Sequence, residues 1–143
     1  MALKVDFFTT STELNEDVFK IDYVKEFSDG LDDCKTKLNI LAKRCKELGV
    51  SVTAKIFELE EILVRINENT IPIILIDANV IWNEYGRSMG HFVPIVGYDE
   101  DNVYVHQPGR KYTKSFMKIN KELFDKARKA KCTENDVLFI SRN

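Results

Sequence analysis

The chain has 143 residues, a formal net charge of -2, 44% hydrophobic residues and 31% charged residues. This length predicts one domain with a substantial core, and the interspersed charges give no electrostatic case for binding nucleic acid or an anionic membrane. Three cysteines without a CxxC pair argue against a disulfide framework or a structural zinc site, so we expect no metal and no cofactor. We expect a cytoplasmic protein, because no apolar run reaches the length of a membrane span and the N-terminus lacks the features of a signal peptide.

The first half of the chain predicts alternating strands and helices. Apolar residues follow helical spacing most clearly from Leu31 to Leu48, and Gly49 fits a C-terminal cap. Cys34 and Cys45 lie on the apolar stripe of this helix, where small buried side chains are common. The other expected elements are a strand over 3–8, an amphipathic helix over 15–27, a strand over 51–57 and a helix over 58–67.

The second half predicts a sheet. The run from Ile71 to Ile76 is apolar throughout, so we expect a central strand buried on both faces. Residues 77–89 form a long polar loop, which hints at a functional rim. The expected elements that follow are a hairpin of strands 91–98 and 102–106, a strand over 115–119, a helix over 121–131 capped by Asn120, and a strand over 137–140.

A histidine opens the first strand of this hairpin. His91 follows Gly90, and a catalytic base at this position needs a nucleophile at one ring nitrogen and an orienting acceptor at the other. The end of the paired strand offers either His106 or Gln107, because the sequence does not fix the register. A glutamine oxygen can accept the Nδ1 proton of the ring, although it brings no negative charge. A strand histidine with a satisfied hydrogen bond and no chemistry is the alternative.

The segment from Gly90 to Pro108 resembles the histidine region of the peptidase C39-like proteins. The shared features are the Gly-His pair, an apolar strand, Gly97-Tyr98-Asp99, a short turn, and a Val-Tyr-Val strand that ends before a proline. The resemblance extends to the preceding strand and, less specifically, to the tail. It implies a papain-like fold with a Cys-His-Asp triad, in which His91 is the general base and Gln107 replaces the aspartate.

The nucleophile that the resemblance implies has no counterpart in the sequence. Cys34 follows two aspartates, Cys45 lies inside an amphipathic helix, and Cys132 follows the histidine in the wrong chain order. Three interpretations stay open. The chain is a non-catalytic member that binds a peptide or protein, or the base-bearing half of a split or larger cysteine peptidase or acyltransferase whose Cys-Gly helix another segment or chain supplies, or a complete enzyme with Cys34 as a displaced nucleophile. Absence of any relation to the family is the fourth possibility.

The predicted fold is α+β, a mostly antiparallel twisted sheet with flanking helices that resembles the sheet half of a papain-like cysteine peptidase. The resemblance implies that residues 1–143 form one peptidase C39-like domain without the N-terminal nucleophile helix. We expect a histidine-bearing cleft that binds peptide or protein and is not an active enzyme alone. His91 and Gln107 are the candidate catalytic residues. The candidate substrate-binding residues are Gly90, Asp77, Trp82 and Tyr85. Trp82 and Tyr85 fit the cleft rim or the core equally well.

Overall fold

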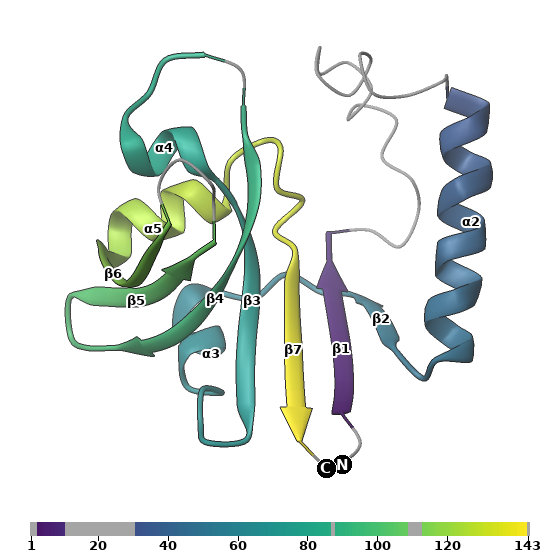
Figure 1. Cartoon of the computed structure of the whole chain (residues 1–143), viewed down its shortest axis with the longest axis horizontal. Helices are drawn as coiled ribbons and strands as arrows, with labels where there is room; N and C mark the ends of the chain where they lie inside the picture. Colours follow the sequence, from purple (N-terminus) through teal and green to yellow (C-terminus); the bar gives the residue numbers. More distant parts are fainter. Residues whose placement is uncertain (1–2, 11–30, 87, 109–112, 143) are drawn as a thin grey trace.

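The computed structural model describes residues 3–10, 31–86, 88–108 and 113–142, without the side chains of residues 31–35 and 38. The helix expected over 15–27 lies outside these residues. One seven-stranded sheet runs through the molecule in the order β2-β1-β7-β3-β4-β5-β6 (Figure 1). Its strands are β1 (Leu3–Thr9), β2 (Ser51–Ala54), β3 (Thr70–Asp77), β4 (Gly90–Tyr98), β5 (Asn102–Gln107), β6 (Lys114–Asn120) and β7 (Val137–Arg142).

The pairing of the strands confirms the predicted fold class. β1 and β2 run parallel, and every other neighbouring pair in the sheet runs antiparallel. The sheet curls on the β4-β5-β6 side, where β5 and β6 fold toward the helices (Figure 1). The helices are α2 (Leu31–Glu47), α3 (Leu59–Leu63), α4 (Ala78–Trp82) and α5 (Lys121–Arg128). This is an α+β fold with a mostly antiparallel sheet.

Residue chemistry explains where the helices begin and end. Asn120 caps α5, because its side-chain oxygen accepts hydrogen bonds from the backbone N–H groups of the first turn. Gly49 follows α2 with φ 74°, as a C-terminal cap requires, so both predicted caps are confirmed. At α3 the backbone N–H of Glu58 donates to the Glu61 carboxylate.

Several predicted boundaries are wrong. The expected strand over 51–57 ends at Ala54, and the expected helices over 58–67 and 121–131 end at Leu63 and Arg128. The expected loop over 77–89 contains α4, which Asp77 caps by accepting a hydrogen bond from the backbone N–H of Asn79. A five-residue helix is too short to carry a periodic apolar pattern, so the sequence gives little sign of it.

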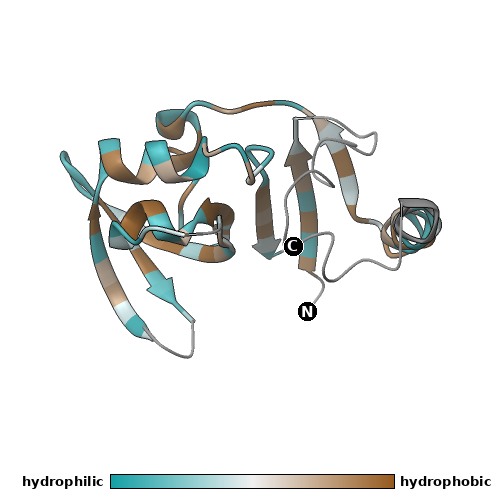
Figure 2. Ribbon diagram, turned by 90° about the horizontal axis from the view of Figure 1, so that it is seen from above, coloured by the Kyte–Doolittle hydropathy of each residue, from teal (hydrophilic) through white to brown (hydrophobic). Residues whose placement is uncertain are grey.

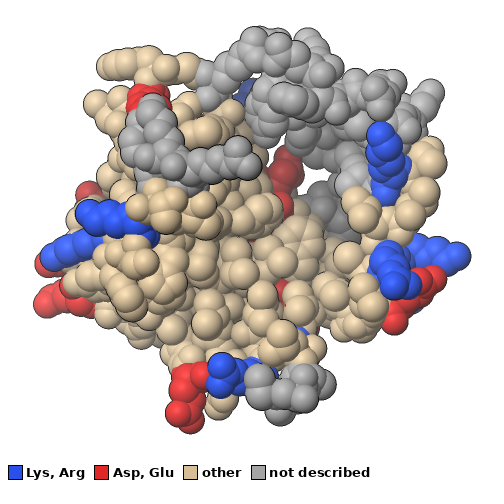
Figure 3. Space-filling model, in the orientation of Figure 1, with Lys and Arg blue, Asp and Glu red and all other residues tan. Residues whose placement is uncertain are grey.

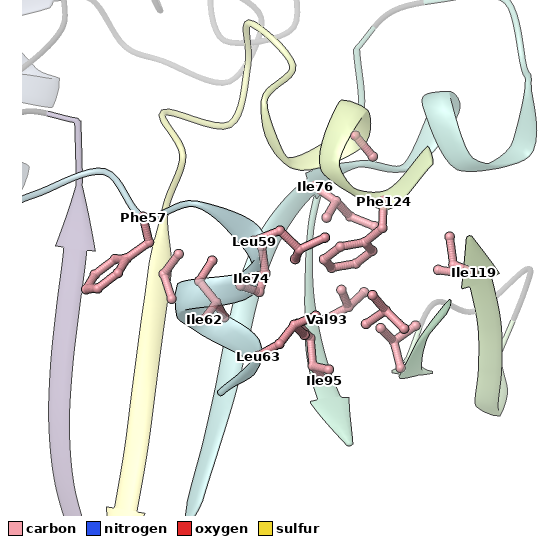
Figure 4. Packing of buried hydrophobic residues seen from close by; sticks show 14 of the residues in the cluster. Phe57, Leu59, Ile62, Leu63, Ile74, Ile76, Val93, Ile95, Ile119 and Phe124 are labelled. Atoms are coloured by element: carbon pink, nitrogen blue, oxygen red, sulfur yellow. The ribbon is translucent and has the colours of Figure 1, made fainter. Parts of the chain in front are cut away.

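The hydrophobic core lies between one face of the sheet and the helices α3 and α5. Buried residues of β3, β4 and β5 meet Leu59, Ile62 and Leu63 from α3 and Phe124 from α5 (Figure 4). Phe57 extends this core toward β1, where its ring packs edge-on against Phe8 at 4.9 Å between centroids. This face holds the apolar side chains that alternate inward along each strand.

The opposite face of the sheet corrects the expectation for the central strand. Ile71 is 46% exposed, and Ile73 and Leu75 are partly exposed, so the run from Ile71 to Ile76 is buried on one face. Cross-strand pairing places further apolar side chains on the same side. We call this surface the open face, and its residues are Leu3, Val5, Phe7, Val52, Ile71, Ile73, Leu75, Phe92, Pro94, Leu138 and Ile140.

The turn before β7 ties three strands together. The backbone N–H of Leu75 donates to the Asp136 carbonyl, and the backbone N–H of Thr10 donates to the Glu134 carbonyl. Glu134 and Asn135 both have positive φ angles, which non-glycine residues adopt at a cost. Burial raises the pKa of the Asp136 carboxyl to about 6. The charge of Glu134 also raises this pKa, whereas a hydrogen bond with Thr9 lowers it.

Replacing a core aromatic should test this packing. Phe124 is fully buried, so Phe124→Ala should lower the free energy of unfolding by about 3–5 kcal/mol through lost burial and a cavity. Tyr85→Ala is the matched control, because Tyr85 is 99% exposed and its loss should change the free energy by less than about 0.5 kcal/mol. Urea denaturation followed by circular dichroism measures both, and equal effects would contradict the described core.

The Asp136 carboxyl should make stability depend on pH. Its raised pKa means that the folded state binds more protons than the unfolded state between about pH 4 and 6, so the free energy of unfolding falls as the pH rises through this window. Asp136→Asn removes the cost of a buried charge and should stabilise the protein by about 1–2 kcal/mol at pH 7.5, after allowance for solvent screening, and little at pH 3.5.

Thermal unfolding at the two pH values measures this difference. Glu100→Gln in the exposed hairpin turn is the control for the removal of a surface carboxylate. A stabilisation by Asp136→Asn that is as large at pH 3.5 as at pH 7.5 would contradict the prediction.

Candidate functional site

The hairpin of β4 and β5 brings His91 and Gln107 together. The Nε2 atom of His91 lies 2.5 Å from the Oε1 atom of Gln107, and the contact is partly buried. Gln107 is 4% exposed, so its side chain is held in place by its surroundings. Because a glutamine oxygen only accepts, Nε2 is the donor in this contact. The expected contact is therefore present, but through Nε2 rather than through Nδ1 as predicted.

A β-bulge in β4 decides which residue faces His91. Tyr98 pairs with Val103 and Gly97 with Tyr104, but Ile95 pairs with Val105, so β4 contains one extra residue between Gly97 and Ile95. A shift of one residue exchanges the two faces of a strand. Without the bulge, the same pairing would continue to His106 opposite Ile95. With it, Val105 takes that place and Gln107 falls on the face of His91.

The register also explains why a long side chain makes the contact. If the register of Ile95 with Val105 is extended by two residues, Val93 falls opposite Gln107. His91 is then the diagonal neighbour of Gln107 rather than its direct partner. Diagonal neighbours lie about 7–8 Å apart, within the reach of a glutamine and an imidazole together.

His106 points away from His91. Its Nδ1 accepts a hydrogen bond of 3.2 Å from the backbone N–H of Phe116, and the two rings pack edge-on with centroids 4.6 Å apart. Phe116 has φ 52° at a second irregularity in the sheet, between β5 and β6. Gln107, and not His106, is therefore the residue that faces His91.

Hydrogen bonds in the hairpin turn hold β4 and β5 together at the end opposite to His91 and Gln107. The Asp99 carboxylate accepts hydrogen bonds from the backbone N–H groups of Asp101 and Asn102 and from the hydroxyl of Tyr104. The Tyr104 hydroxyl and the Asn102 amide hold the pKa of Asp99 well below its usual range. The same contact raises the pKa of Tyr104. This network locks the chain direction at the turn and so supports the register.

Asp77 is the last residue of β3 and follows Ile76, the residue that pairs with His91. It pairs with Gly90 in register, is 6% exposed, and accepts hydrogen bonds from the backbone N–H groups of Asn79 and Met89. Its other oxygen lies 3.6 Å from the Sγ atom of Cys132. Asp77 thus joins the end of β3 to the start of β4 and caps α4. No contact with His91 is seen among its hydrogen bonds in the described part of the chain.

A pocket of about 270 Å³ opens beside Asp77. Its described lining residues are Asp77, Asn79, Val80, Asn83, Glu84, Gly86 and Lys126. Asp77 therefore lies in a pocket, but His91 and Gln107 are not among those residues. Trp82 is half-buried at the end of α4, while Tyr85 is 99% exposed, which rules out the core for Tyr85. Neither a motif nor a spacing in the sequence connects Lys126 and Glu84 to Asp77, so sequence analysis did not single them out.

The described cysteines differ in their surroundings from an activated nucleophile. Burial and the Asp77 carboxylate raise the pKa of the Cys132 thiol, which disfavours the thiolate. Cys45 is a free, half-buried cysteine of α2. The side chain of Cys34 lies outside the described residues. Among residues 3–10, 31–86, 88–108 and 113–142, no group of three or more His, Cys, Asp or Glu side chains could hold a metal ion.

The geometry of the His91–Gln107 pair is compatible with general-base chemistry. Nε2 of His91 contacts an uncharged acceptor, and in the described part of the chain no hydrogen bond is seen at Nδ1, the atom at which a general base would accept a proton. Gln107 orients the ring but does not stabilise its charged form as a carboxylate would. None of the helices in the described part of the chain is long and apolar enough to span a membrane.

Comparison with known proteins gave two matches. A family model described as guanylylate cyclase matches residues 1–140. A solved crystal structure of a Bacillus anthracis protein assigned as a C39-like peptidase matches with a TM-score of 0.44 and 18% sequence identity. That match covers 60% of this chain, which spans 48% of the other chain. The comparison with curated proteins found no match.

The tautomer of His91 can be measured directly. In long-range ¹H–¹⁵N correlation spectra at pH 8, His91 should be the Nε2–H tautomer in the wild-type protein, because Gln107 accepts that proton. Gln107→Ala should give a mixture of both tautomers. His106 is the internal control, since the Phe116 N–H occupies its Nδ1 and should hold it as Nε2–H in both proteins. An unchanged His91 signal in Gln107→Ala would show that Gln107 does not set the tautomer.

Proposed function

This chain belongs to the guanylylate cyclase family, whose model spans residues 1–140, and we propose that its His91–Gln107 pair is the proton-accepting half of a site that acts on peptides or proteins. In this proposal the domain binds a peptide or protein ligand and is not catalytic alone. It becomes the base-bearing half of a cysteine-dependent acyl transfer when another segment or chain brings a thiol. The short contact between His91 Nε2 and Gln107 Oε1 is the observation that carries the proposal.

The proposed step moves one proton and exchanges one acyl group. The thiol gives its proton to His91 Nδ1, and the thiolate attacks the substrate carbonyl carbon to form a new S–C bond. The C–N bond of the peptide then breaks, and the leaving amine takes the proton from His91. Water releases the acyl group from sulfur in the same manner.

Acidity favours a thiol as the group that His91 deprotonates. A cysteine thiol has an ordinary pKa of about 8.5, whereas a sugar hydroxyl is a much weaker acid, and proton transfer is efficient when the two groups are matched. Gln107 brings no negative charge to stabilise an imidazolium, so it would do little to favour proton transfer from a weakly acidic group to His91. Cys132 does not fit the role, because its surroundings raise its pKa.

Cyclisation of a guanine nucleotide is a second candidate, and the family match favours it. His91 would then accept the proton of the ribose 3′-hydroxyl, the 3′-oxygen would form a bond to the α-phosphorus, and pyrophosphate would leave. Lys114 lies opposite Gln107 in the pairing of β5 with β6 and would bring a positive charge to the phosphates.

Adding an exogenous thiol tests acyl transfer separately from nucleotide cyclisation. With 2-mercaptoethanol and p-nitrophenyl acetate, the wild-type protein should accelerate thiol-dependent release of p-nitrophenolate, and His91→Ala should lower the accelerated rate by about tenfold or more. Gln107→Glu keeps the side-chain length and adds a charge that stabilises the imidazolium, so its rate should exceed that of the wild type. His106→Ala is the control, because His106 contacts Phe116 rather than the site.

Equal rates for the wild-type protein and His91→Ala would overturn the proposed base. The nucleotide alternative is measured on the same four proteins with GTP and Mg²⁺ or Mn²⁺, by mass-spectrometric detection of cyclic GMP and pyrophosphate. Cyclic GMP formation that depends on His91 would replace acyl transfer by cyclisation as the function of the pair.

A further inference from the structure

Asp77 is the most deeply buried acidic residue in the described part of the chain, with 6% of its surface exposed. Figure 3 shows that most of the Lys, Arg, Asp and Glu side chains in that view lie toward the margins of the molecule, where water solvates them. A carboxylate that leaves water costs free energy unless hydrogen bonds replace its solvation. The hydrogen bonds of Asp77 therefore indicate what this buried charge does.

One oxygen of Asp77 holds two segments of the chain. Its Oδ1 accepts a hydrogen bond of 3.0 Å from the backbone N–H of Asn79 and one of 3.1 Å from the backbone N–H of Met89. The carbonyl of Met89 in turn accepts a hydrogen bond of 2.9 Å from the backbone N–H of Ala78. Both backbone groups of Met89 are thus bound to the junction of β3 and α4 (Figure 1). We call these three hydrogen bonds the Asp77 clamp.

The Asp77 clamp lies just before the candidate base. Met89 precedes Gly90, the first residue of β4, and Asp77 pairs with Gly90 while Ile76 pairs with His91. Gly90 has no side chain whose packing could limit the movement of the strand end. The hydrogen bonds of Met89 therefore hold the chain at the point where it enters β4.

The contact between His91 and Gln107 tolerates little movement. Its two side chains meet diagonally across neighbouring strands, and Nε2 lies 2.5 Å from Oε1. Gln107 is buried, whereas His91 is only one residue from the start of its strand, and the ends of strands open more readily than their centres. A displacement of His91 by about 1 Å away from Gln107 would lengthen the contact beyond ordinary hydrogen-bond distance.

We propose that Asp77 is a positioning residue for His91, because its clamp on Met89 places the imidazole within hydrogen-bond distance of Gln107. This inference rests on the proposed role of His91 as the base, and it needs no contact between Asp77 and substrate. Asp77 acts through the backbone, so the acceptor oxygen is essential and the negative charge is not. The clamp belongs to the part of the molecule that contains α3, α4 and α5, and α2 lies at the other end (Figures 1 and 2).

The tautomer of His91 tests the positioning role without any reaction. Asp77→Ala removes the acceptor oxygen and should turn the Nε2–H tautomer of His91 into a mixture in long-range ¹H–¹⁵N spectra at pH 8, whereas Asp77→Asn keeps an oxygen and should restore it. Asn120→Ala is the matched control. Asn120 also accepts two backbone N–H groups, but it pairs with Asn102 at the far end of β5 from Gln107. Its loss should lower the melting temperature and leave the His91 tautomer unchanged.

The thiol-dependent release of p-nitrophenolate gives a second readout. Asp77→Ala should lower the His91-dependent rate by about tenfold, because misplaced catalytic groups lose rate steeply, and Asp77→Asn should stay within about twofold of the wild type. Circular dichroism checks folding. Asp77→Ser keeps a helix-capping oxygen on a side chain too short for Met89, and it replaces Asp77→Ala if that variant does not fold.

Two outcomes separate this inference from the proposed function. An unchanged His91 tautomer in the folded Asp77→Ala or Asp77→Ser protein would overturn the positioning role of Asp77, whatever the rates are. A mixed tautomer in that variant, together with equal rates for the wild-type protein and His91→Ala, would support the positioning of the imidazole and overturn its proposed use as a base.

Discussion

The bulge in β4 is the constraint on which the candidate site depends. It adds one residue between Ile95 and Gly97, and a shift of one residue exchanges the two faces of a strand. Gln107 therefore lies on the face of His91, while His106 turns to Phe116. The hydrogen bonds around Asp99 hold the hairpin turn, so the register is fixed at both ends. The pair is a product of backbone pairing as much as of side-chain chemistry.

The His91–Gln107 pair and the neighbouring Asp77 make separate sets of contacts. His91 and Gln107 belong to β4 and β5, which pack against the core through Val93, Ile95 and Val105. Asp77 ends β3, caps α4, contacts Cys132 and lines the pocket beside α4. Its hydrogen bonds to backbone N–H groups explain its burial without any catalytic role. A base that is oriented by an uncharged acceptor suits a partner that is itself fairly acidic, which is why a thiol is the preferred proton donor in the proposed reaction.

The family match and the sequence resemblance lead in different directions. The resemblance rested on the Gly-His pair and the hairpin after it, whereas the family model matches residues 1–140 and bears the description guanylylate cyclase. Both interpretations use the same histidine as the base, and they differ in the group that it deprotonates.

The sequence alone predicted the α+β class, the hairpin, and the caps at Asn120 and Gly49, because these follow from local periodicity and residue chemistry. It did not predict α4 or the exposed side of β3. A five-residue helix has no clear period, and a strand that is apolar on both sides looks the same whether one or both sides are covered. The choice between His106 and Gln107, and the use of Nε2 rather than Nδ1, were decided by tertiary structure. Both depend on a one-residue bulge and a diagonal contact between strands, and strand register is set by pairing across the sheet rather than by the residues of one strand.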